Sequence, residues 1–201
     1  MTKQFIVQDP YFAKAKKLGY RARSAFKLIE LQEKYNLIHP KMNVLDVGAA
    51  PWSFLQVIAK IVDLEHKVVG IDIQKIDPNF GRPNIHLLQE SIFEYDKIRT
   101  FLDSLNIGQF DLITSDIAPS TTGMSGVDQY RSIELNLAIL DVAKVFLKKW
   151  GNLVLKVFVW EDINDLMAPL KENFAKVSRF KPKACRERSF EEYFIGLWKK
   201  D

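Results

Sequence analysis

The feature that most constrains the fold of this chain is the stretch Asn43–Phe54, with the sequence NVLDVGAAPWSF. A short apolar strand leads through Asp46 to the small-residue turn Gly48–Pro51, and an amphipathic helix follows. Such a turn after a parallel strand lets backbone amides and the positive end of the helix approach a ligand. Because Ala50 and Ser53 stand where the G-x-G-x-x-G fingerprint needs glycines, a nicotinamide cofactor is disfavoured. Asp46 instead favours a cationic or hydroxyl-rich ligand.

Apolar runs alternate with segments of helical periodicity along the rest of the chain. The pattern predicts strands at residues 43–47, 67–72, 84–88, 110–115, 152–159, 175–180 and 193–199. It predicts helices at residues 21–35, 95–105, 127–149 and 163–173, and one more from the glycine turn to about residue 62. Trp150-Gly151 ends the long helix at 127–149. Strands separated by helices, then a closing strand pair, indicate an α/β fold: a seven-stranded, mostly parallel sheet with one antiparallel strand and helices on both faces. We expect one domain, with residues 1–36 as a basic, aromatic arm and helix and residues 37–201 as a Rossmann-like core.

Basic residues gather in two stretches, although the net charge of the 201-residue chain is only +4. Lys14–Lys27 contains no acid, and Lys176–Arg188 contains Glu187 alone. A single such stretch is usually a solvated face, but two of them, the first interleaved with aromatic side chains, favour a nucleic acid partner. The candidate RNA-binding residues are Lys14, Lys16, Lys17, Arg21, Arg23, Lys181, Lys183, Arg186 and Arg188.

The chain has one cysteine, Cys185, which excludes an internal disulfide framework and a multi-cysteine zinc site and suits a reducing compartment. We therefore expect no metal and an incidental or structural cysteine. The amino-terminal residues lack the pattern of a signal peptide, and no uninterrupted apolar run reaches the length of a membrane span. These features predict a soluble, intracellular protein with no membrane partner.

Three polar residues, one inside a predicted strand and two at strand ends, are candidates for chemistry. Lys156 is embedded in the apolar run LVLKVFV, where an unpaired charge would cost several kcal/mol, so it needs partners or must reach the end of the strand. Asp116 follows the neighbouring strand, at the edge where open α/β sheets bind their ligands. The two could form a plain buried salt bridge, yet their place at this edge favours a functional site. Asp72, about 20 residues beyond the glycine turn, suits a ribose-binding carboxylate, or it simply caps the turn that follows.

The chain resembles the FtsJ-type (RrmJ-like) RNA ribose 2′-O-methyltransferases, which use S-adenosyl-L-methionine and have a Rossmann-like class I methyltransferase fold. The resemblance extends from about Asp9 to Lys199 and rests on the segments DPYFAKAKKLGYRARSAFKL, VLDVGAAP, SDIAPSTTG, LVLKVF and RERSFEEYF. Separate motifs in the right order are more specific than any one of them. The resemblance implies a catalytic set of two lysines and two acids, which are Lys27, Asp116, Lys156 and Glu191.

The chemistry of methyl transfer to ribose accounts for these residue types. A ribose 2′-hydroxyl is a weak acid and must lose its proton as it attacks the methyl carbon on the sulfonium. A lysine that is neutral, because of burial and a second nearby lysine, can accept that proton. The resemblance therefore implies Lys156 as the base, with Asp116 orienting it and the hydroxyl. Lys27 would hold phosphate or ribose and Glu191 would position the cluster, while Asp116 as the base itself stays open.

For the cofactor, the resemblance implies that the Gly48–Pro51 turn faces the methionine part and Asp72 the adenosine. The family usually has GAAPGG where this chain has GAAPWS, so Trp52 either lines the cofactor pocket or packs outward. The family also tends to place an aspartate near Ser91 for the adenine, so Glu90 or the local backbone would have to serve here. The implied cofactor-binding residues are Asp46, Gly48, Ala49, Ala50, Pro51, Trp52, Asp72, Ile73, Glu90, Ser91, Ile92 and Asp116.

Compact members of the family most often modify ribosomal RNA, typically a uridine in the A loop of large-subunit (23S-type) rRNA. The resemblance thus implies rRNA or the large ribosomal subunit as partner and a monomer in the cytoplasm, or in an organelle or the nucleolus of a eukaryote. A tRNA anticodon-loop methyltransferase is the closest alternative, because GYRARSAFKL occurs in that branch too. A non-catalytic RNA-binding or ribosome-assembly factor, deprived of cofactor by Trp52, is another, and a nicotinamide oxidoreductase is a distant third.

Overall fold

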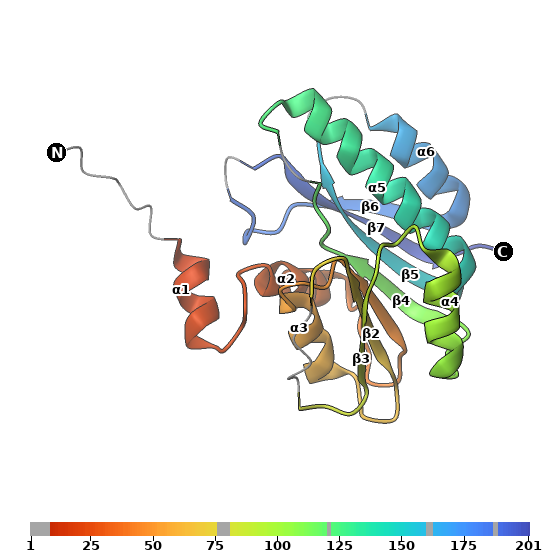
Figure 1. Ribbon diagram of the computed structural model, residues 1–201. Helices are drawn as coiled ribbons and strands as arrows, with labels where there is room; N and C mark the ends of the chain where they lie inside the picture. Colours follow the sequence, from red (N-terminus) through yellow and green to blue (C-terminus); the bar gives the residue numbers. More distant parts are fainter. Residues whose placement is uncertain (1–8, 76–80, 120–121, 160–162, 187–188) are drawn as a thin grey trace.

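The computed structural model describes residues 9–75, 81–119, 122–159, 163–186 and 189–201. Its centre is a seven-stranded sheet with the order β3-β2-β1-β4-β5-β7-β6 (Figure 1). The strands are β1 (Val44–Val47), β2 (Val68–Asp72), β3 (Ile85–Gln89), β4 (Phe110–Ser115), β5 (Leu147–Phe158), β6 (Phe174–Phe180) and β7 (Glu191–Lys199). Only β7 runs antiparallel to its neighbours within this described sheet. This confirms the predicted mostly parallel sheet with one antiparallel strand.

Helices cover both faces of the sheet (Figure 1). They are α1 (Pro10–Lys17), α2 (Ala25–Tyr35), α3 (Ser53–Ile61), α4 (Tyr95–Ser104), α5 (Ser125–Phe146) and α6 (Asn164–Asn173). One hydrophobic cluster joins α4, α5 and α6 to one face through residues such as Ile139 and Ile113. A second joins α2 and α3 to the other face through residues such as Leu28 and Leu112. Leu112 and Ile113 are consecutive in β4 and belong to opposite clusters, as the two-residue period of a strand requires.

The long helix α5 ends at Phe146 and not at Trp150, where the sequence analysis places its end. Leu147 continues the apolar spacing of the helix, but in the structure it begins β5 and pairs with Phe110. Trp150 is exposed within the irregular start of that strand and has a φ of +66°. The prediction was wrong here because an apolar residue fits the end of a helix and the start of a buried strand equally well.

The segment before the core is a short helix, α1, that is fastened to α3. Asp9 caps α1 by accepting hydrogen bonds from two of its backbone amides. The next helix, α2, begins at Ala25 and not at Arg21 as predicted. Between the helices, the amide of Arg21 donates to Gln56 Oε1 at 2.8 Å and Gln56 Nε2 donates to the carbonyl of Gly19 at 2.9 Å.

Across the described residues, no helix combines the length and apolar character needed to cross a membrane.

Candidate active site

The structure brings together four side chains that lie far apart in the sequence. Lys156 is in β5, Asp116 directly follows β4, Glu191 begins β7, and Lys27 is in α2. Because β4 and β7 both pair with β5, the ends that carry these residues meet at one edge of the sheet. Lys156 Nζ lies 3.2 Å from Asp116 Oδ1, and Lys27 forms an ion pair with Glu191. Lys27, Lys156 and Glu191 are 8%, 7% and 9% exposed, so the charges are largely screened from water.

A fifth side chain, Tyr193, belongs to this cluster although the sequence analysis does not single it out. Its hydroxyl donates to Asp116 Oδ1 at 2.6 Å, and its backbone pairs with that of Lys156 across β5 and β7. Burial, together with the charges of Asp116 and Glu191, raises the pKa of Tyr193 well above its ordinary value. The hydroxyl is therefore a lasting donor. Its position two residues after Glu191, on the same face of a strand, is the sequence signal that could have found it.

The charge states within the cluster follow from opposing effects of burial and neighbouring charges. Burial disfavours the charged form of Asp116, but the ammonium groups of Lys156 and Lys27 and the hydroxyl of Tyr193 outweigh it and lower the pKa of Asp116. Burial also disfavours the cationic form of Lys27, but Asp116 and Glu191 outweigh it and raise the pKa of Lys27. At neutral pH Asp116 is an anion and Lys27 a cation.

Cys185 contacts the same cluster. Its thiol donates to Glu191 Oε1 at 3.3 Å, on the side of the carboxylate group that pairs with Lys27. Burial, followed by the charge of Glu191, raises the pKa of Cys185 to about 12. The thiol is thus a protonated donor that orients Glu191, and a poor nucleophile.

The turn after β1 adopts a conformation that requires glycine. Gly48 has a φ of +73°, and a Cβ at this position would lie 2.9 Å from the Cβ of Ile117. Its amide and that of Ala49 donate to the carbonyl of Ile71 in β2, at 2.8 and 3.2 Å. These bonds fix the turn against the neighbouring strand, and the absence of a side chain at Gly48 lets Ile117 pack directly on its backbone.

Two acids flank this turn. Asp72 accepts hydrogen bonds from the amides of Ala50 and Gln74, at 2.9 and 2.8 Å, so it shapes the turn directly and also caps the turn after β2. Asp46 is 1% exposed; its Oδ1 accepts from the hydroxyl of Thr114 at 2.7 Å, while its Oδ2 has no hydrogen-bond partner among the described residues. Burial raises the pKa of Asp46 to about 8.

An unsatisfied, buried carboxylate oxygen is stabilised by a ligand that brings a donor, preferably a charged one. The methionine part of S-adenosyl-L-methionine carries an ammonium group of this kind. The unsatisfied oxygen of Asp46, which lies just before the turn, therefore fits this cofactor.

Trp52 follows the cis Ala50-Pro51 peptide and has a φ of +87°, a conformation in which glycine is favoured. Its side chain is 4% exposed and lies in the hydrophobic cluster beneath α2 and α3. The guanidinium of Arg21 lies over the indole, 4.1 Å from the ring centroid. Of the two predicted placements, the outward one is wrong, because the ring packs inward beneath Arg21.

The residues expected on the adenine side occupy different environments. Glu90 accepts from the amide of Ser91 at 3.0 Å and forms an ion pair with Lys97 at 2.9 Å, so it is engaged within its own segment. Ile92 is 5% exposed and its side chain belongs to the core, whereas Ile73 is 71% exposed. From Ile92 a ligand could receive only backbone contacts.

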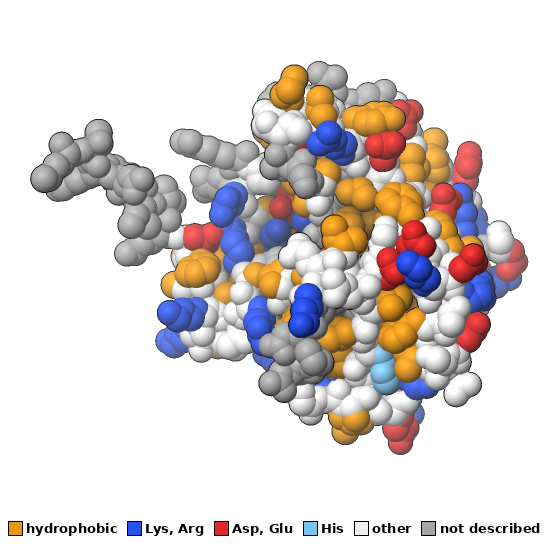
Figure 2. Space-filling model, in the orientation of Figure 1, with side chains coloured by type: hydrophobic (Ala, Val, Ile, Leu, Met, Phe, Trp, Pro, Cys, Tyr) orange, Lys and Arg blue, Asp and Glu red, His pale blue; other side chains and the backbone are white. Residues whose placement is uncertain are grey.

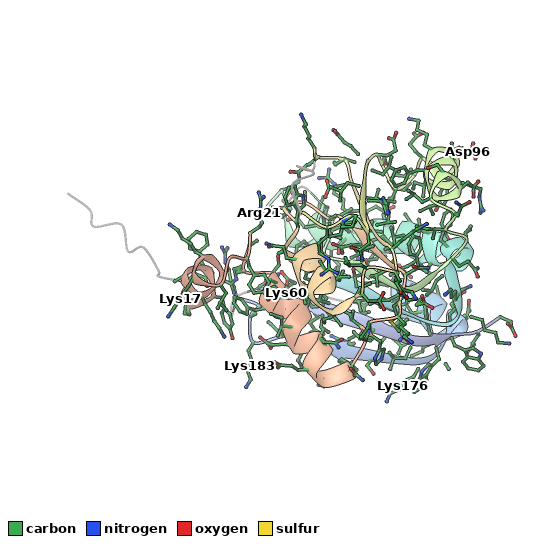
Figure 3. The ribbon with its side chains drawn as sticks, turned by 90° about the horizontal axis from the view of Figure 1, so that it is seen from below. Lys17, Arg21, Lys60, Asp96, Lys176 and Lys183 are labelled. Carbon is green, nitrogen blue, oxygen red and sulfur yellow. The ribbon has the colours of Figure 1, made fainter. Side chains whose placement is uncertain are left out.

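The predicted RNA-binding residues differ in how far their side chains are exposed. The exposed ones are Lys14, Lys16, Lys17, Arg21, Lys181, Lys183 and Arg186. Arg23 is partly buried, forms an ion pair with Asp9 and donates to the carbonyl of Ala184, so it ties α1 to the segment between β6 and β7. Arg188 lies outside the described residues. Figure 3 shows Lys17, Arg21 and Lys183 at the end of the molecule that α1 forms, and in Figure 2 basic side chains gather over the same end.

The sheet is doubly wound, with a glycine turn after β1, an acid at the end of β2 and a lysine–carboxylate cluster at the same edge. These features together define a Rossmann-like enzyme of the methyltransferase type. Within the part of the chain that the structure describes, no three His, Cys, Asp or Glu side chains are grouped to hold a metal ion. The chain belongs to the FtsJ-like methyltransferase family, whose pattern matches residues 20–199.

Individual relatives are similar over nearly the full length of the chain. A ribosomal RNA large subunit methyltransferase E from Acinetobacter baumannii is 39% identical over 96% of this chain and 88% of its own. The protein of that name from Pseudomonas fluorescens is 35% identical over 94% of this chain and 90% of its own. A crystal structure from Plasmodium falciparum, described as a candidate ribosomal RNA methyltransferase, is 29% identical with a TM-score of 0.77, covering 90% of this chain and 98% of that one.

Proposed function

We propose that this methyltransferase transfers a methyl group from S-adenosyl-L-methionine to a ribose 2′-hydroxyl of ribosomal RNA, at a uridine in the A loop of the large subunit. The single observation that carries the proposal is the buried cluster of Lys27, Asp116, Lys156, Glu191 and Tyr193 beside the glycine turn. Relatives at 35% and 39% identity, named as methyltransferases of large-subunit rRNA, support the substrate. We further propose that the protein acts as a monomer in the cytoplasm.

In the proposed reaction a bond forms between the ribose oxygen and the methyl carbon, the bond from that carbon to sulfur breaks, and the hydroxyl proton passes to the enzyme. The cofactor, when bound, supplies the methyl group on a sulfonium. Lys156 acts as the general base in its deprotonated form: its ammonium group first releases a proton, and the neutral amine then takes the proton of the ribose hydroxyl. Asp116, 3.2 Å from Nζ of Lys156, orients the amine and the hydroxyl. Lys27 stays protonated and holds the ribose or an adjacent phosphate, while Glu191 fixes Lys27.

Tyr193 and the turn complete the assignment of roles. The Tyr193 hydroxyl keeps Asp116 in place through its 2.6 Å bond. The backbone of the Gly48–Pro51 turn, the unsatisfied oxygen of Asp46 and the carboxylate of Asp72 would hold the cofactor. Aligning the two reactants in this site contributes most of the rate.

The base can be identified from pH profiles of Lys156→Met and Asp116→Asn. Removing a general base lowers the rate by about 10²- to 10⁴-fold. We expect no measurable turnover from the Lys156 variant at any pH, whereas the Asp116 variant retains a rate that rises with pH. Lys149→Met, in the same strand but half exposed, controls for the loss of a lysine. Turnover by Lys156→Met with the wild-type pH profile would identify Asp116 as the base.

The activity itself is tested by incubating the protein with tritiated methyl donor and total RNA or isolated large subunits, then mapping the labelled nucleotide. We expect alkali-resistant label at one uridine of large-subunit rRNA, since 2′-O-methylation blocks cleavage at that ribose. Label in a tRNA anticodon loop would favour the closest alternative function, and label on a base would refute ribose chemistry.

A second candidate function, a non-catalytic RNA-binding or assembly factor, is favoured by one observation: a tryptophan occupies the left-handed position that follows the cofactor turn. Calorimetric titration with S-adenosyl-L-methionine separates the two functions. We expect heat of binding and protection against thermal unfolding. Absence of both would support the non-catalytic function.

A further inference from the structure

A second concave site lies away from the catalytic cluster. A cavity of about 450 Å³ opens between α1, α2 and the end of β6, and none of the five clustered side chains lines it. This volume is within the range of sites that bind small ligands, roughly 300–1,000 Å³. The cavity is lined by three aromatic rings, of Tyr11, Phe26 and Phe180, and by three lysines, Lys14, Lys34 and Lys183.

The rings and amines of this cavity contact one another. The ammonium of Lys34 lies 4.1 Å from the centroid of the Phe180 ring, and that of Lys14 lies 4.8 Å from the centroid of Phe26. Such cation–π contacts at a surface are weak. A phosphate group forms stronger, charge-assisted hydrogen bonds with lysine, so it would draw these amines away from the rings and free the face of Phe180 for stacking.

Two acids also line the cavity, and they differ in role. Glu30 accepts hydrogen bonds from the amides of Lys183 and Ala184, at 2.6 and 2.9 Å, so its charge is used to hold the segment after β6 against α2. Glu33 is exposed and opposes an incoming anion. The cavity thus has three lysine charges and only one carboxylate, that of Glu33, that is not bound to backbone amides. This excess of positive charge favours the binding of a phosphate.

We propose that this cavity binds one nucleotide of the substrate RNA outside the methylated nucleotide, with its phosphate on Lys14, Lys34 and Lys183 and its base stacked on Phe180. The inference rests on the proposed RNA substrate. It extends that function because α2 carries both Phe26, which lines the cavity, and the adjacent Lys27 of the catalytic cluster. A nucleotide held here would set the register of the RNA relative to the reacting ribose. Stacking is tolerant of base identity, so the site contributes affinity and placement more than sequence choice.

The test is a set of four variants in the full chain, assayed for methylation of rRNA. Phe180→Leu should raise the KM for RNA about ten-fold, since stacking on one ring contributes roughly that factor or more, and leave kcat and the KM for the cofactor unchanged. Lys34→Met should raise the KM and reduce the slope of log affinity against log salt by about one. Glu33→Gln should lower the KM. Lys14→Met should behave as Lys34→Met does.

Two matched controls lie outside the cavity. Phe12→Leu removes a ring of α1 that is 63% exposed, and Lys176→Met removes an exposed lysine of β6 that points away from α1 in Figure 3. Neither should change the KM for RNA. Because the ring of Phe180 also contacts the ring of Tyr35, the melting temperature of Phe180→Leu is compared with that of the wild type. The lysine and Glu33 variants change exposed side chains, so they test the cavity independently of folding.

The outcomes separate this proposal from the proposed function. If the wild type methylates RNA and all cavity variants keep its KM and salt slope, the nucleotide site is refuted and the function stands. If the wild type methylates no RNA, the function is refuted, and RNA binding by fluorescence anisotropy tests the cavity alone with the same variants. Uridine monophosphate is the comparison ligand: if it binds as tightly as RNA and the RNA does not displace it, the cavity is a site for free nucleotides and the proposal is wrong.

Discussion

Replacing Trp52 by glycine, the residue usual in the family, sets two effects of known size against each other. Trp52 holds a left-handed backbone conformation with a φ of +87°, and relief of that strain would stabilise the fold by about 1–2 kcal/mol. Its ring, however, is 4% exposed and covered by Arg21, and removing a buried tryptophan costs about 3–5 kcal/mol. We therefore expect Trp52→Gly to lower the free energy of unfolding by roughly 1–4 kcal/mol.

At roughly 2–4 °C per kcal/mol for a chain of this size, the variant should melt about 2–16 °C below the wild type. Differential scanning calorimetry and urea unfolding measure the loss. Trp52→Ala is the matched control: it loses the same ring and keeps the left-handed strain, so it should be about 1–2 kcal/mol less stable than Trp52→Gly. A Trp52→Gly protein that melts at or above the wild-type temperature would refute the inference that the ring is part of the core.

The same variant bears on the cofactor. If the indole packs into the core and leaves the cofactor site open, wild type and Trp52→Gly should bind S-adenosyl-L-methionine with similar affinity at a temperature where both are folded. Binding by Trp52→Gly together with none by the wild type would show that the ring closes the site, as the non-catalytic alternative requires.

The cluster and the turn give further predictions for Tyr193, Cys185 and Asp46. Tyr193→Phe removes the 2.6 Å bond to Asp116 and should lower kcat by about 10-fold without changing the melting temperature by more than a few degrees, as measured by single-turnover kinetics and scanning calorimetry. Cys185→Ala should lower kcat less than Glu191→Gln does. In the wild type, reactivity toward a thiol reagent should stay low and rise about ten-fold per pH unit between pH 6 and 8 without levelling off, because the pKa of Cys185 is raised to about 12. The pKa of Asp46 is about 8 in the folded protein and lies at about 4 in the unfolded chain. The contribution of Asp46 to stability is therefore fully present below about pH 4 and declines as the pH rises toward 8. Urea unfolding at pH 5 and pH 8 should show a smaller loss of stability for Asp46→Asn than for the wild type. Cofactor binding near neutral pH should also release a proton in the wild type and not in Asp46→Asn, which titration calorimetry in two buffers of different ionisation enthalpy detects.

Much of the fold could be predicted because each strand is a compact apolar run bounded by turn residues. Lys156 and Asp116 were accessible to the same reasoning, since a lysine inside an apolar strand and an acid at the next strand's end are both costly in a plain core. Lys27 and Glu191 were found only through the family resemblance. Lys27 lies one residue from Phe26 in a helix that could equally have left it in water, and its burial depends on Glu191, far away in the sequence.

Other features depend on contacts that no local pattern encodes. Tyr193 looks like an ordinary core aromatic in a strand, and only the pairing of β5 with β7 turns its hydroxyl toward Asp116. The inward packing of Trp52 depends on Arg21 from the connection between α1 and α2. The engagement of Arg23 with Asp9 and Ala184 joins three separate segments, so a charge count could not distinguish it from the exposed cations around it.

The position of β7 in the sheet has a consequence for biosynthesis. Although it comes after β6 in the chain, β7 lies between β5 and β6, and it brings both Glu191 and Tyr193 to the cluster. Until that strand has emerged from the ribosome and inserted, β6 has no partner in the sheet and the lysines lack two of their neighbours. A nascent chain of this protein should therefore be inactive until β7 is in place. Stop codons placed shortly before β7 should abolish methylation and leave an open sheet edge that is prone to aggregation.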